Sequence, residues 1–176
     1  MGRLKEPEKG LVFTAIFSKD QPLIKEVSLA LSNFYKSRIL LSSEIFLFNH
    51  TNYYEKEMGS NLKKQIFLYD YLIDTSLISD IKIKTNELEE KFSEGKSLRM
   101  VNIDPGYITL SKVCLATTKN YSHRIYIGKS IYVEVTLNYR SGSFITNPWT
   151  YPDYKEKKVI EFFNKARHFL KQRQKF

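Results

Sequence analysis

The sequence predicts an α+β fold in which two helices pack on one face of an antiparallel sheet. The segment 10–18 is apolar on both of its alternating faces, which indicates a central strand covered on both sides. Two segments with apolar residues at helical spacing, each flanked by strand-like runs, precede Asp104. The order β-α-β-β-α-β is the ferredoxin-like arrangement, here extended by a β-hairpin and a C-terminal helix. We expect one domain, 1–176, with a ferredoxin-like front half (1–104) and the extension in 105–176.

The front half is built from alternating strand and helix signals. Asp20 can cap a first helix, whose apolar residues recur at helical spacing. These residues are Leu23, Val27, Ala30, Leu31 and Phe34. Asp74 or Thr75 can cap a second helix in the same way. Its apolar face carries Ile78, Ile81, Thr85, Leu88 and Phe92. The remaining strand-like runs occupy 39–48, 65–71 and 98–103.

The second half begins with a turn signal, Asp-Pro-Gly-Tyr, at 104–107. Thr109 can cap a short helix that extends to the polar loop 117–122. Asp153 and Glu156 have the spacing of a capping box, which predicts that the last helix begins there. Its apolar stripe consists of Val159, Phe162, Phe163, Ala166, Phe169 and Leu170. Because these aromatic side chains would otherwise face water, we expect this helix to pack on the sheet.

A β-hairpin is the clearest local pattern of the second half. Residues 131–139 alternate apolar and polar side chains, which is typical of a strand with one buried face, and 124–127 provides its partner. If Ile125 and Ile127 lie on the apolar face, the loop is Gly128-Lys129-Ser130. The expected cross-strand pairs are Ile127 with Ile131, Ile125 with Val133, Arg124 with Glu134 and Tyr126 with Tyr132.

Composition and charge exclude several classes of protein. The chain has 28 Lys and Arg residues against 19 Asp and Glu, a formal net charge of +9. Residues 155–176 hold eight basic and two acidic residues, which either attract an anionic partner or form a solvated helix end. The single cysteine excludes a disulfide framework within the chain. No apolar run is long enough to span a membrane and no apolar signal core follows Met1, so we expect a cytoplasmic protein.

Familiar catalytic motifs do not fit the sequence. Gly128-Lys129-Ser130 resembles the end of a P-loop, but His123 stands where that motif needs its first Gly, and a strand follows instead of a helix. Gly-x-Gly-x-x-Gly and Gly-x-Ser-x-Gly are both absent. Cys114 lies among apolar residues, which indicates a buried structural thiol. Binding of GTP or ATP would therefore need another geometry.

The densest polar stretch is 102–126, and the candidate site in 102–134 includes it. Lys and Arg can neutralise a phosphate while hydroxyls complete its shell, although an ordinary loop with local turns would look similar. The candidate ligand-binding residues are Lys112, Thr117, Lys119, Arg124 and Tyr126. The candidate catalytic residues are His123, as general acid or base, with Asp104 or Glu134 as its partner. The same three side chains could also hold a divalent cation, but no spacing selects them.

Several motifs resemble those of a known family. They are Asn52-Tyr53-Tyr54, Glu57-Met58-Gly59, Lys84-Thr85-Asn86-Glu87-Leu88-Glu89, Asn102-Ile103-Asp104-Pro105-Gly106-Tyr107, Leu115-Ala116-Thr117-Thr118-Lys119, Ser122-His123-Arg124-Ile125-Tyr126 and Pro148-Trp149-Thr150-Tyr151-Pro152-Asp153-Tyr154. By these motifs the chain is similar, over nearly its whole length, to the bacterial domain-of-unknown-function family 4416. That family has no assigned activity to carry over, and some relatives are labelled GTP-binding. The resemblance implies a characteristic site around Asp104, Lys119, His123, Arg124 and Glu134.

These observations leave three functional hypotheses. The first is a binding protein for a phosphate-bearing ligand, either a nucleotide such as GTP or RNA, in which cations neutralise the phosphate. His123 and Tyr126 would orient or stack the ligand, and Glu134 would hold the hairpin arginine. The second is a hydrolase or transferase on a phosphorylated substrate that uses His123. The third is an adaptor for an unidentified protein partner, with an exposed apolar patch and no cluster of perturbed titratable groups. No pattern identifies a cofactor.

Overall fold

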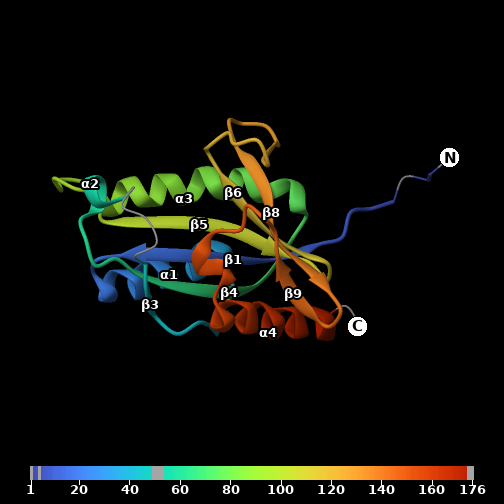
Figure 1. Cartoon of the computed structure of the whole chain (residues 1–176). Coiled ribbons are helices and arrows are strands. Elements are labelled where there is room, and N and C mark those ends of the chain that lie inside the picture. Colours follow the sequence, from blue (N-terminus) through green and yellow to red (C-terminus); the bar gives the residue numbers. More distant parts are fainter. Residues whose placement is uncertain (1, 4, 49–53, 174–176) are drawn as a thin grey trace.

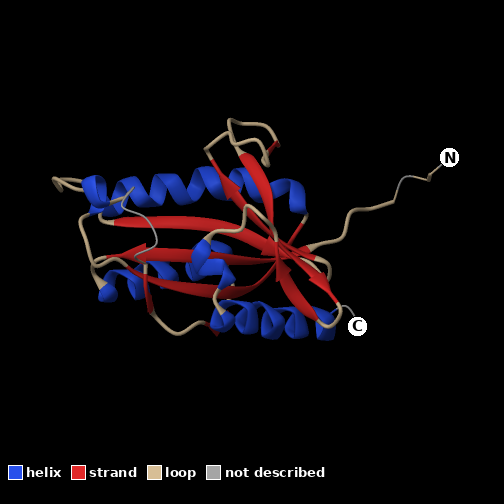
Figure 2. Ribbon diagram, viewed as in Figure 1, coloured by secondary structure: helices blue, strands red, loops and turns tan. Residues whose placement is uncertain are grey.

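The computed structural model describes residues 2–3, 5–48 and 54–173 (Figures 1 and 2). Its strands are β1 (Gly10–Ser18), β2 (Ile39–Ser42), β3 (Phe46–Leu47), β4 (Lys63–Ile73), β5 (Val101–Ile108), β6 (Lys112–Thr117), β7 (Ile125–Tyr126), β8 (Tyr132–Arg140) and β9 (Ser143–Thr146). Its helices are α1 (Gln21–Tyr35), α2 (Glu55–Met58), α3 (Ile78–Ser93) and α4 (Lys157–Arg173), with short 3-10 helices η1 (Thr75–Leu77) and η2 (Pro152–Lys155). Asn52 and Tyr53 of the first family motif lie outside the described residues.

The strands of the described residues form one nine-stranded sheet, ordered β2-β4-β1-β5-β6-β8-β7, with β3 beside β4 and β9 beside β8. Each of these pairings is antiparallel. β1 lies between β4 and β5, and every residue of β1 is buried, as its doubly apolar sequence predicts. The single strand expected over 39–48 is instead divided into β2 and β3. The protein is therefore a mixed α and β structure with a large antiparallel sheet.

Helices cover both faces of this sheet (Figure 1). Val12 and Ile16 of β1 belong to the apolar core under α1 and α3. On the opposite face, Phe13 of β1 meets Phe163 of α4 with ring centroids 4.9 Å apart. The expected apolar stripe of α4 is buried in this second core, with Phe169 partly buried. Burial of two separate apolar layers is the main stabilising contribution of the fold.

The last helix begins later than the capping-box prediction. Residues 152–155 form η2, and Glu156 has extended backbone, so α4 begins at Lys157. Asp153 does not cap the helix, because its carboxylate accepts a hydrogen bond from Lys64 Nζ at 2.6 Å. The predicted capping role of Asp153 is therefore wrong, and the residue belongs to the site described below.

Two expected elements of the second half are strands in the structure. Residues 104–107 were expected to turn, but they lie inside β5, where each pairs with β1. A Cβ on Gly106 would lie 2.3 Å from the carbonyl oxygen of Cys114, so this glycine permits close approach of β6 and not a turn. The helix expected from Thr109 is β6, because Thr109 N–H donates to the carbonyl of Lys112 and closes a tight turn.

The predicted hairpin register is confirmed, and its apolar face is buried in part, since Ile131 lies in the core and Val133 and Val135 pack against it. Ile125 pairs with Val133, and Ile127 N–H donates to the carbonyl of Ile131 at 3.0 Å. Ile125 is nevertheless 69% exposed, whereas Arg124 and Glu134 are buried. β8 also pairs with β6 and with β9, and β9 was not predicted. No helix among the described residues has the length and apolar character needed to cross a bilayer.

Candidate functional site

A cleft of about 650 Å³ opens where β5 and β6 separate. These strands pair only over Gly106–Ile108 of β5, while β6 continues to Thr117 beside β8. Figure 1 shows β6 and β8 leaving the direction of β5 on the side of α3. Within the described residues, the first half of β5 therefore has no strand beside it on the β6 side, and the cleft occupies that position.

The floor of the cleft comes from three neighbouring strands. Phe17 of β1 is paired with Lys64 of β4 and with Asn102 of β5, so these side chains form one row. Asp104 follows Asn102 on the same face, because side chains on a strand alternate with a period of two. Sheet register alone thus brings together residues that are distant in sequence.

Helix α3 supplies the hydrogen bonds that a strand next to β5 would otherwise make. Glu89 accepts the N–H of Ile103 at 2.5 Å, and Lys82 Nζ donates to the carbonyl of the same residue at 2.9 Å. Lys82 Nζ also lies 3.5 Å from the Asp104 carboxylate. Burial raises the pKa of Glu89 above its ordinary value, against the opposing effects of Lys82 and Arg99.

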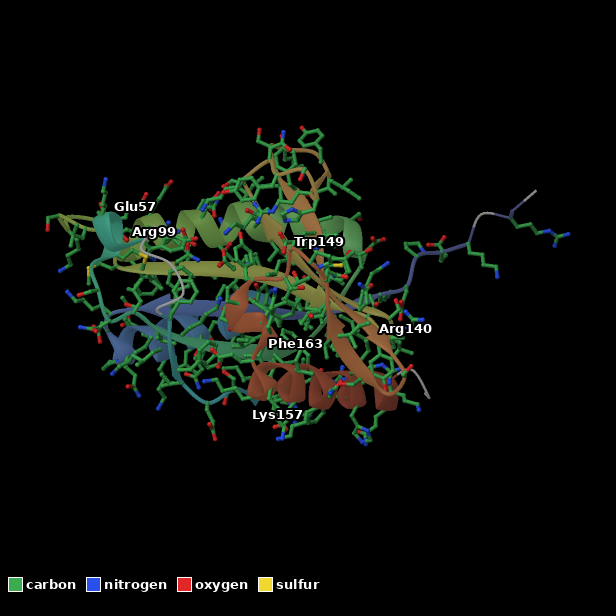
Figure 3. All side chains as sticks on the ribbon, in the orientation of Figure 1. Glu57, Arg99, Arg140, Trp149, Lys157 and Phe163 are labelled. Atoms are coloured by element: carbon green, nitrogen blue, oxygen red, sulfur yellow. The ribbon has the colours of Figure 1, made fainter. Side chains whose placement is uncertain are left out.

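Arg99 connects α2, α3 and β5 at one end of the cleft. Its guanidinium donates to Glu89 and to Asn102 Oδ1, and it lies 3.6 Å from the Glu57 carboxylate. Figure 3 labels Glu57 and Arg99, which lie next to each other. Asn102 is only 3% exposed, and its Nδ2 has no hydrogen-bond partner among the described residues. A buried amide N–H without an acceptor is costly, so this side chain is one of the few unsatisfied polar groups of the described structure.

Lys64 and Asp153 form a second buried ion pair. Lys64 Nζ is 2.6 Å from the Asp153 carboxylate and lies 4.8 Å from the ring centre of Phe48 and 4.9 Å from that of Tyr154. The Tyr154 hydroxyl is buried and has no hydrogen-bond partner within the described part of the chain. Burial, followed by the nearby Asp153 carboxylate, raises the pKa of Tyr154 well above its ordinary value, so this phenol stays protonated.

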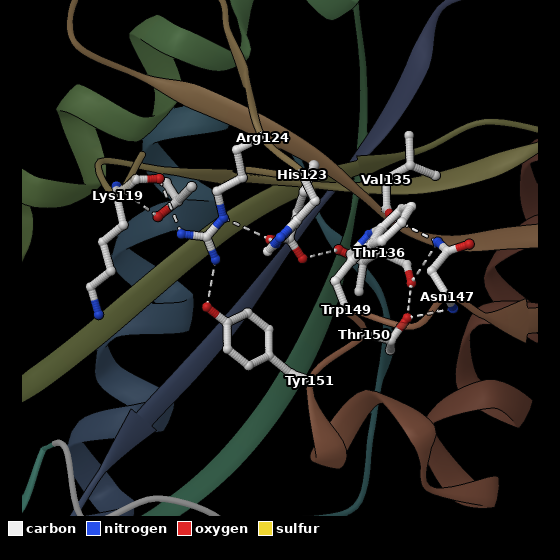
Figure 4. A network of polar contacts seen from close by, with 11 residues as sticks. Lys119, His123, Arg124, Val135, Thr136, Asn147, Trp149, Thr150 and Tyr151 are labelled. Atoms are coloured by element: carbon white, nitrogen blue, oxygen red, sulfur yellow. Dashed lines mark hydrogen bonds and ion pairs between the residues drawn. The ribbon is translucent and has the colours of Figure 1, made fainter. Parts of the chain in front are cut away.

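Arg124 is the centre of a third group of hydrogen-bonded polar side chains in the cleft (Figure 4). Its Nε donates to Glu134 at 2.8 Å, Nη1 to the carbonyl of Lys119 at 3.1 Å, and Nη2 to the Tyr151 hydroxyl at 2.6 Å. The guanidinium also lies 4.4 Å from the ring centre of Tyr121. Burial, the largest single influence, lowers the pKa of Arg124, but the combined effects of Glu134 and Tyr151 outweigh it and raise the arginine pKa.

The segment 147–151 explains why the polar face of β8 is buried. Thr150 Oγ1 donates to the carbonyl of Thr136, and Trp149 Nε1 donates to the carbonyl of Val135 (Figure 4). This segment lies against β8 and leads into η2, which lines the cleft. This segment contacts β8 through hydrogen bonds, so the polar side chains of Glu134 and Thr136 can be buried beneath it. The alternating sequence pattern instead predicts that these two side chains are exposed to solvent.

Five of the eight predicted site residues line the cleft. They are Asp104, Thr117, Lys119, Arg124 and Glu134. His123 does not line it, but its Nε2 lies 3.1 Å from Glu134 and its ring stacks on Trp149. Tyr126 is exposed on β7, and Lys112 begins β6 at the end away from Thr117. Among the described residues, Asp104, His123 and Glu134 do not come together as a group that could hold a metal ion.

Sequence reasoning missed the half of the cleft that comes from the front of the chain. The missed charged residues of this half are Glu57, Lys64, Lys82, Glu89, Glu90 and Arg99, and Asp153 of η2 was missed as well. A signal existed for two of them, because Lys82 and Glu89 occur at helical spacing on the face of α3 that also carries the buried Ile78. No comparable signal marked Lys64 or Asp153, which are 89 residues apart.

One property unites the cleft. The charged residues that are buried in the described structure are Lys64, Lys82, Glu89, Arg124, Glu134 and Asp153, and all of them line it. Buried ion pairs add little stability compared with apolar packing, because both charges lose their hydration. A concentration of such groups in one concave region is typical of a functional site.

The fold and the cleft define a mixed α and β protein with a large antiparallel sheet and a cavity lined by charged and aromatic residues. The chain belongs to the family described as Domain of unknown function (DUF4416), whose model matches residues 8–169. The family resemblance predicted from the sequence is therefore confirmed. No curated protein and no solved structure matches the chain.

Proposed function

We propose that the protein binds a small phosphate-bearing molecule in the cleft between β5 and β6. The observation that carries this proposal is that every buried charged residue of the described structure lines that cleft. Its volume of about 650 Å³ lies within the range of small-molecule sites, roughly 300–1,000 Å³. A nucleotide such as GTP, or one nucleotide of an RNA, has the corresponding size.

The lining supplies groups for both parts of a nucleotide. Lys119 and Arg124 can face a phosphate, and the hydroxyl of Thr117 lies on the same lining. The rings of Phe17 and Tyr54 lie 4.9 Å apart in the lining, with Lys119 Nζ 5.3 Å from the centre of the Tyr54 ring, and they can stack on a ligand ring. Lys112 and Tyr126 lie outside the cleft, so they would contact only a longer ligand such as RNA.

Titration calorimetry with GTP, ATP and a short single-stranded RNA, each with and without magnesium, tests this proposal. We expect saturable binding of at least one of them, weakened roughly tenfold by Lys119→Ala because a charge-assisted contact is lost. Lys129→Ala is the matched control, since Lys129 is exposed and pairs with Asp80 away from the cleft. The absence of binding to every probe, or equal binding by the Lys119 variant, would contradict the proposal.

A second candidate is a hydrolase or transferase acting on a phosphorylated substrate. The contact between His123 Nε2 and Glu134 at 3.1 Å favours it, because Glu134 lines the cleft and could exchange a proton with the imidazole. Asp104 makes no described contact with His123 and would not be its partner. Phosphate release by wild type, lost in His123→Gln with ligand binding retained, would establish turnover. Equal phosphate release by both proteins would exclude a role for His123.

An adaptor function has less support. Ile125 and Tyr126 are exposed on β7 and could contact a protein partner. The hypothesis also requires that no perturbed titratable cluster exists, whereas burial and charge shift the pKa values of Glu89, Arg124 and Tyr154 around one cleft.

We also propose that the front half of the chain is a ferredoxin-like unit and that the protein is cytoplasmic. The order β2-β4-β1-β5, with α1 and α3 on one face, supports a ferredoxin-like unit within the larger sheet. The free thiol of Cys114 is compatible with a reducing cytoplasm.

A further inference from the structure

A band of aromatic side chains begins at the rim of the cleft. Tyr121 and Tyr151 line the cleft, and both are also exposed to solvent. The guanidinium of Arg124 lies 4.4 Å from the ring centre of Tyr121 and 5.9 Å from that of Tyr151. The ring of His123 lies 6.1 Å from that of Tyr121 and stacks on Trp149, with the two planes 13° apart (Figure 4). The exposed rings outside the cleft are therefore continuous with its lining.

The β7–β8 hairpin extends this aromatic band. Tyr126 pairs with Tyr132 across the hairpin, with the two ring centres 5.4 Å apart, and Tyr126 is 59% exposed. Tyr132 also pairs with Thr117 of β6, which lines the cleft. Because paired residues of antiparallel strands point to the same face of a sheet, both tyrosines lie on the face that carries the cleft. Ile125 precedes Tyr126 on the strand, so it points to the opposite face and does not belong to the band.

The charge around the band favours a polyanionic ligand. Residues 117–151, which carry the whole band, contain four basic residues but only one acidic residue, Glu134. Glu134 is buried and paired with Arg124, so its charge does not face a ligand on the band. Lys119 joins the band to the cleft, because its carbonyl accepts from Arg124 while its Nζ lies 5.3 Å from the centre of the Tyr54 ring in the lining. A phosphate beside Lys119 would therefore lie between the cleft and the band.

The charge inside the cleft limits what the ligand can be. Among the described lining residues, six carboxylates stand against five cations, so the lining as a whole is slightly acidic. A nucleoside triphosphate brings several negative charges to one place, and those without a partner are costly in a partly buried site. One nucleotide of a nucleic acid strand brings a single phosphate charge, which matches this lining better.

We propose, building on the proposed function, that the ligand is a single-stranded nucleic acid and not a free nucleotide. One nucleotide occupies the cleft, and a phosphate of the strand meets Lys119 at the rim. The neighbouring bases stack on the exposed rings of Tyr121, Trp149 and Tyr126. Bases of a single strand are free to stack on side chains, whereas those of a duplex are already paired and stacked. Both RNA and single-stranded DNA present this chemistry, so the experiment uses both.

Fluorescence anisotropy at physiological ionic strength tests this inference with a labelled strand of about ten nucleotides, as RNA and as DNA. We expect at least one single strand to bind roughly tenfold or more tighter than its own duplex and than competing GTP, because each stacked base adds affinity. Equal or tighter binding of the duplexes would show that charge alone attracts the strand and would overturn the inference. Equal or tighter binding of GTP would also overturn it, leaving the proposed function intact and the band to a protein partner. Failure of every probe to bind would overturn both.

Variants of the hairpin locate the bases outside the cleft. Tyr126→Ala should weaken binding of the preferred strand roughly tenfold, which is the effect of one lost stacked base, and leave GTP binding unchanged. Tyr126→Phe keeps the ring and should bind the strand as wild type does. Ile125→Ala is the matched control, because Ile125 is the neighbouring exposed residue on the opposite face of β7. Strand binding that is the same in Tyr126→Ala and wild type would contradict the inference.

Discussion

One face of the sheet is packed in two different ways. Towards one end, α4 covers β1 and β5 with the apolar side chains of Phe162, Phe163 and Leu170 (Figure 3). Towards the other end, the same two strands and β4 carry Phe17, Asn102, Asp104 and Lys64, which line a cleft beneath η2. Continuous strands thus support an apolar core and a charged cavity on a single surface.

The difference arises from where α4 begins. Because residues 152–155 form η2 and Glu156 is extended, the helix covers the sheet only from Lys157 onward. A helix begun at Asp153 would place that carboxylate at a cap and remove it from Lys64. The comparison teaches that the apolar half stabilises the fold, while the charged half is the part to which our proposal assigns ligand binding. Each prediction below tests that division.

Replacement of Phe163 by Ala should have the largest effect. Its side chain is fully buried between α4 and β1 and packs edge to face on Phe13. Loss of the ring should lower the free energy of unfolding by about 3–5 kcal/mol, measured by urea denaturation. A loss below about 1 kcal/mol would show that the apolar half is not the stabilising half.

Asp153→Asn tests the charged half. Removal of one partner leaves Lys64 charged and buried, so we expect the free energy of unfolding to fall by about 3 kcal/mol. The double variant Lys64→Met with Asp153→Leu should return close to wild-type stability, because apolar residues pack without desolvated charge. If the double variant is as unstable as Asp153→Asn, the ion pair is structural and the proposed division is wrong.

Glu89→Gln tests the charged half through pH. Burial raises the pKa of Glu89 in the folded protein above the ordinary value of 4.5, so folding favours its protonated form. This favourable contribution is complete below the unfolded pKa and is lost as the pH rises through the folded pKa. Wild type should therefore lose stability relative to the variant with rising pH, by about 1.4 kcal/mol for each unit of pKa shift. Urea denaturation at a series of pH values measures this, and parallel curves would contradict it.

The parts of the fold that the sequence predicts are those determined by local pattern. β1, α1, α3 and the register of the β7–β8 hairpin follow from apolar periodicity. Residues 104–107 could not be assigned in this way, because Pro and Gly ordinarily indicate a turn. Only the pairing of that segment with β1 makes it a strand, and this pairing joins residues about 90 positions apart in the chain.

The candidate site shows the same limit. Arg124 and Glu134 could be paired from the sequence, because they oppose each other across a hairpin. Lys64 and Asp153 could not, because β4 and η2 meet only through the tertiary fold. Lys82 and Glu89 could have been identified from the sequence, since charged residues on the buried face of a predicted helix are unusual.

The smallest expected effect concerns the hairpin, where sequence and structure disagree. Apolar alternation places Ile125 on the buried face, but β7 is the last strand in the sheet order and Ile125 is 69% exposed there. Ile125→Thr should therefore change the free energy of unfolding by less than about 0.5 kcal/mol. Ile131→Ala, at a buried position of the same hairpin, should cost roughly 2 kcal/mol or more under the same urea denaturation. Equal losses for the two variants would mean that Ile125 is buried in solution, in contradiction to its exposed position on β7.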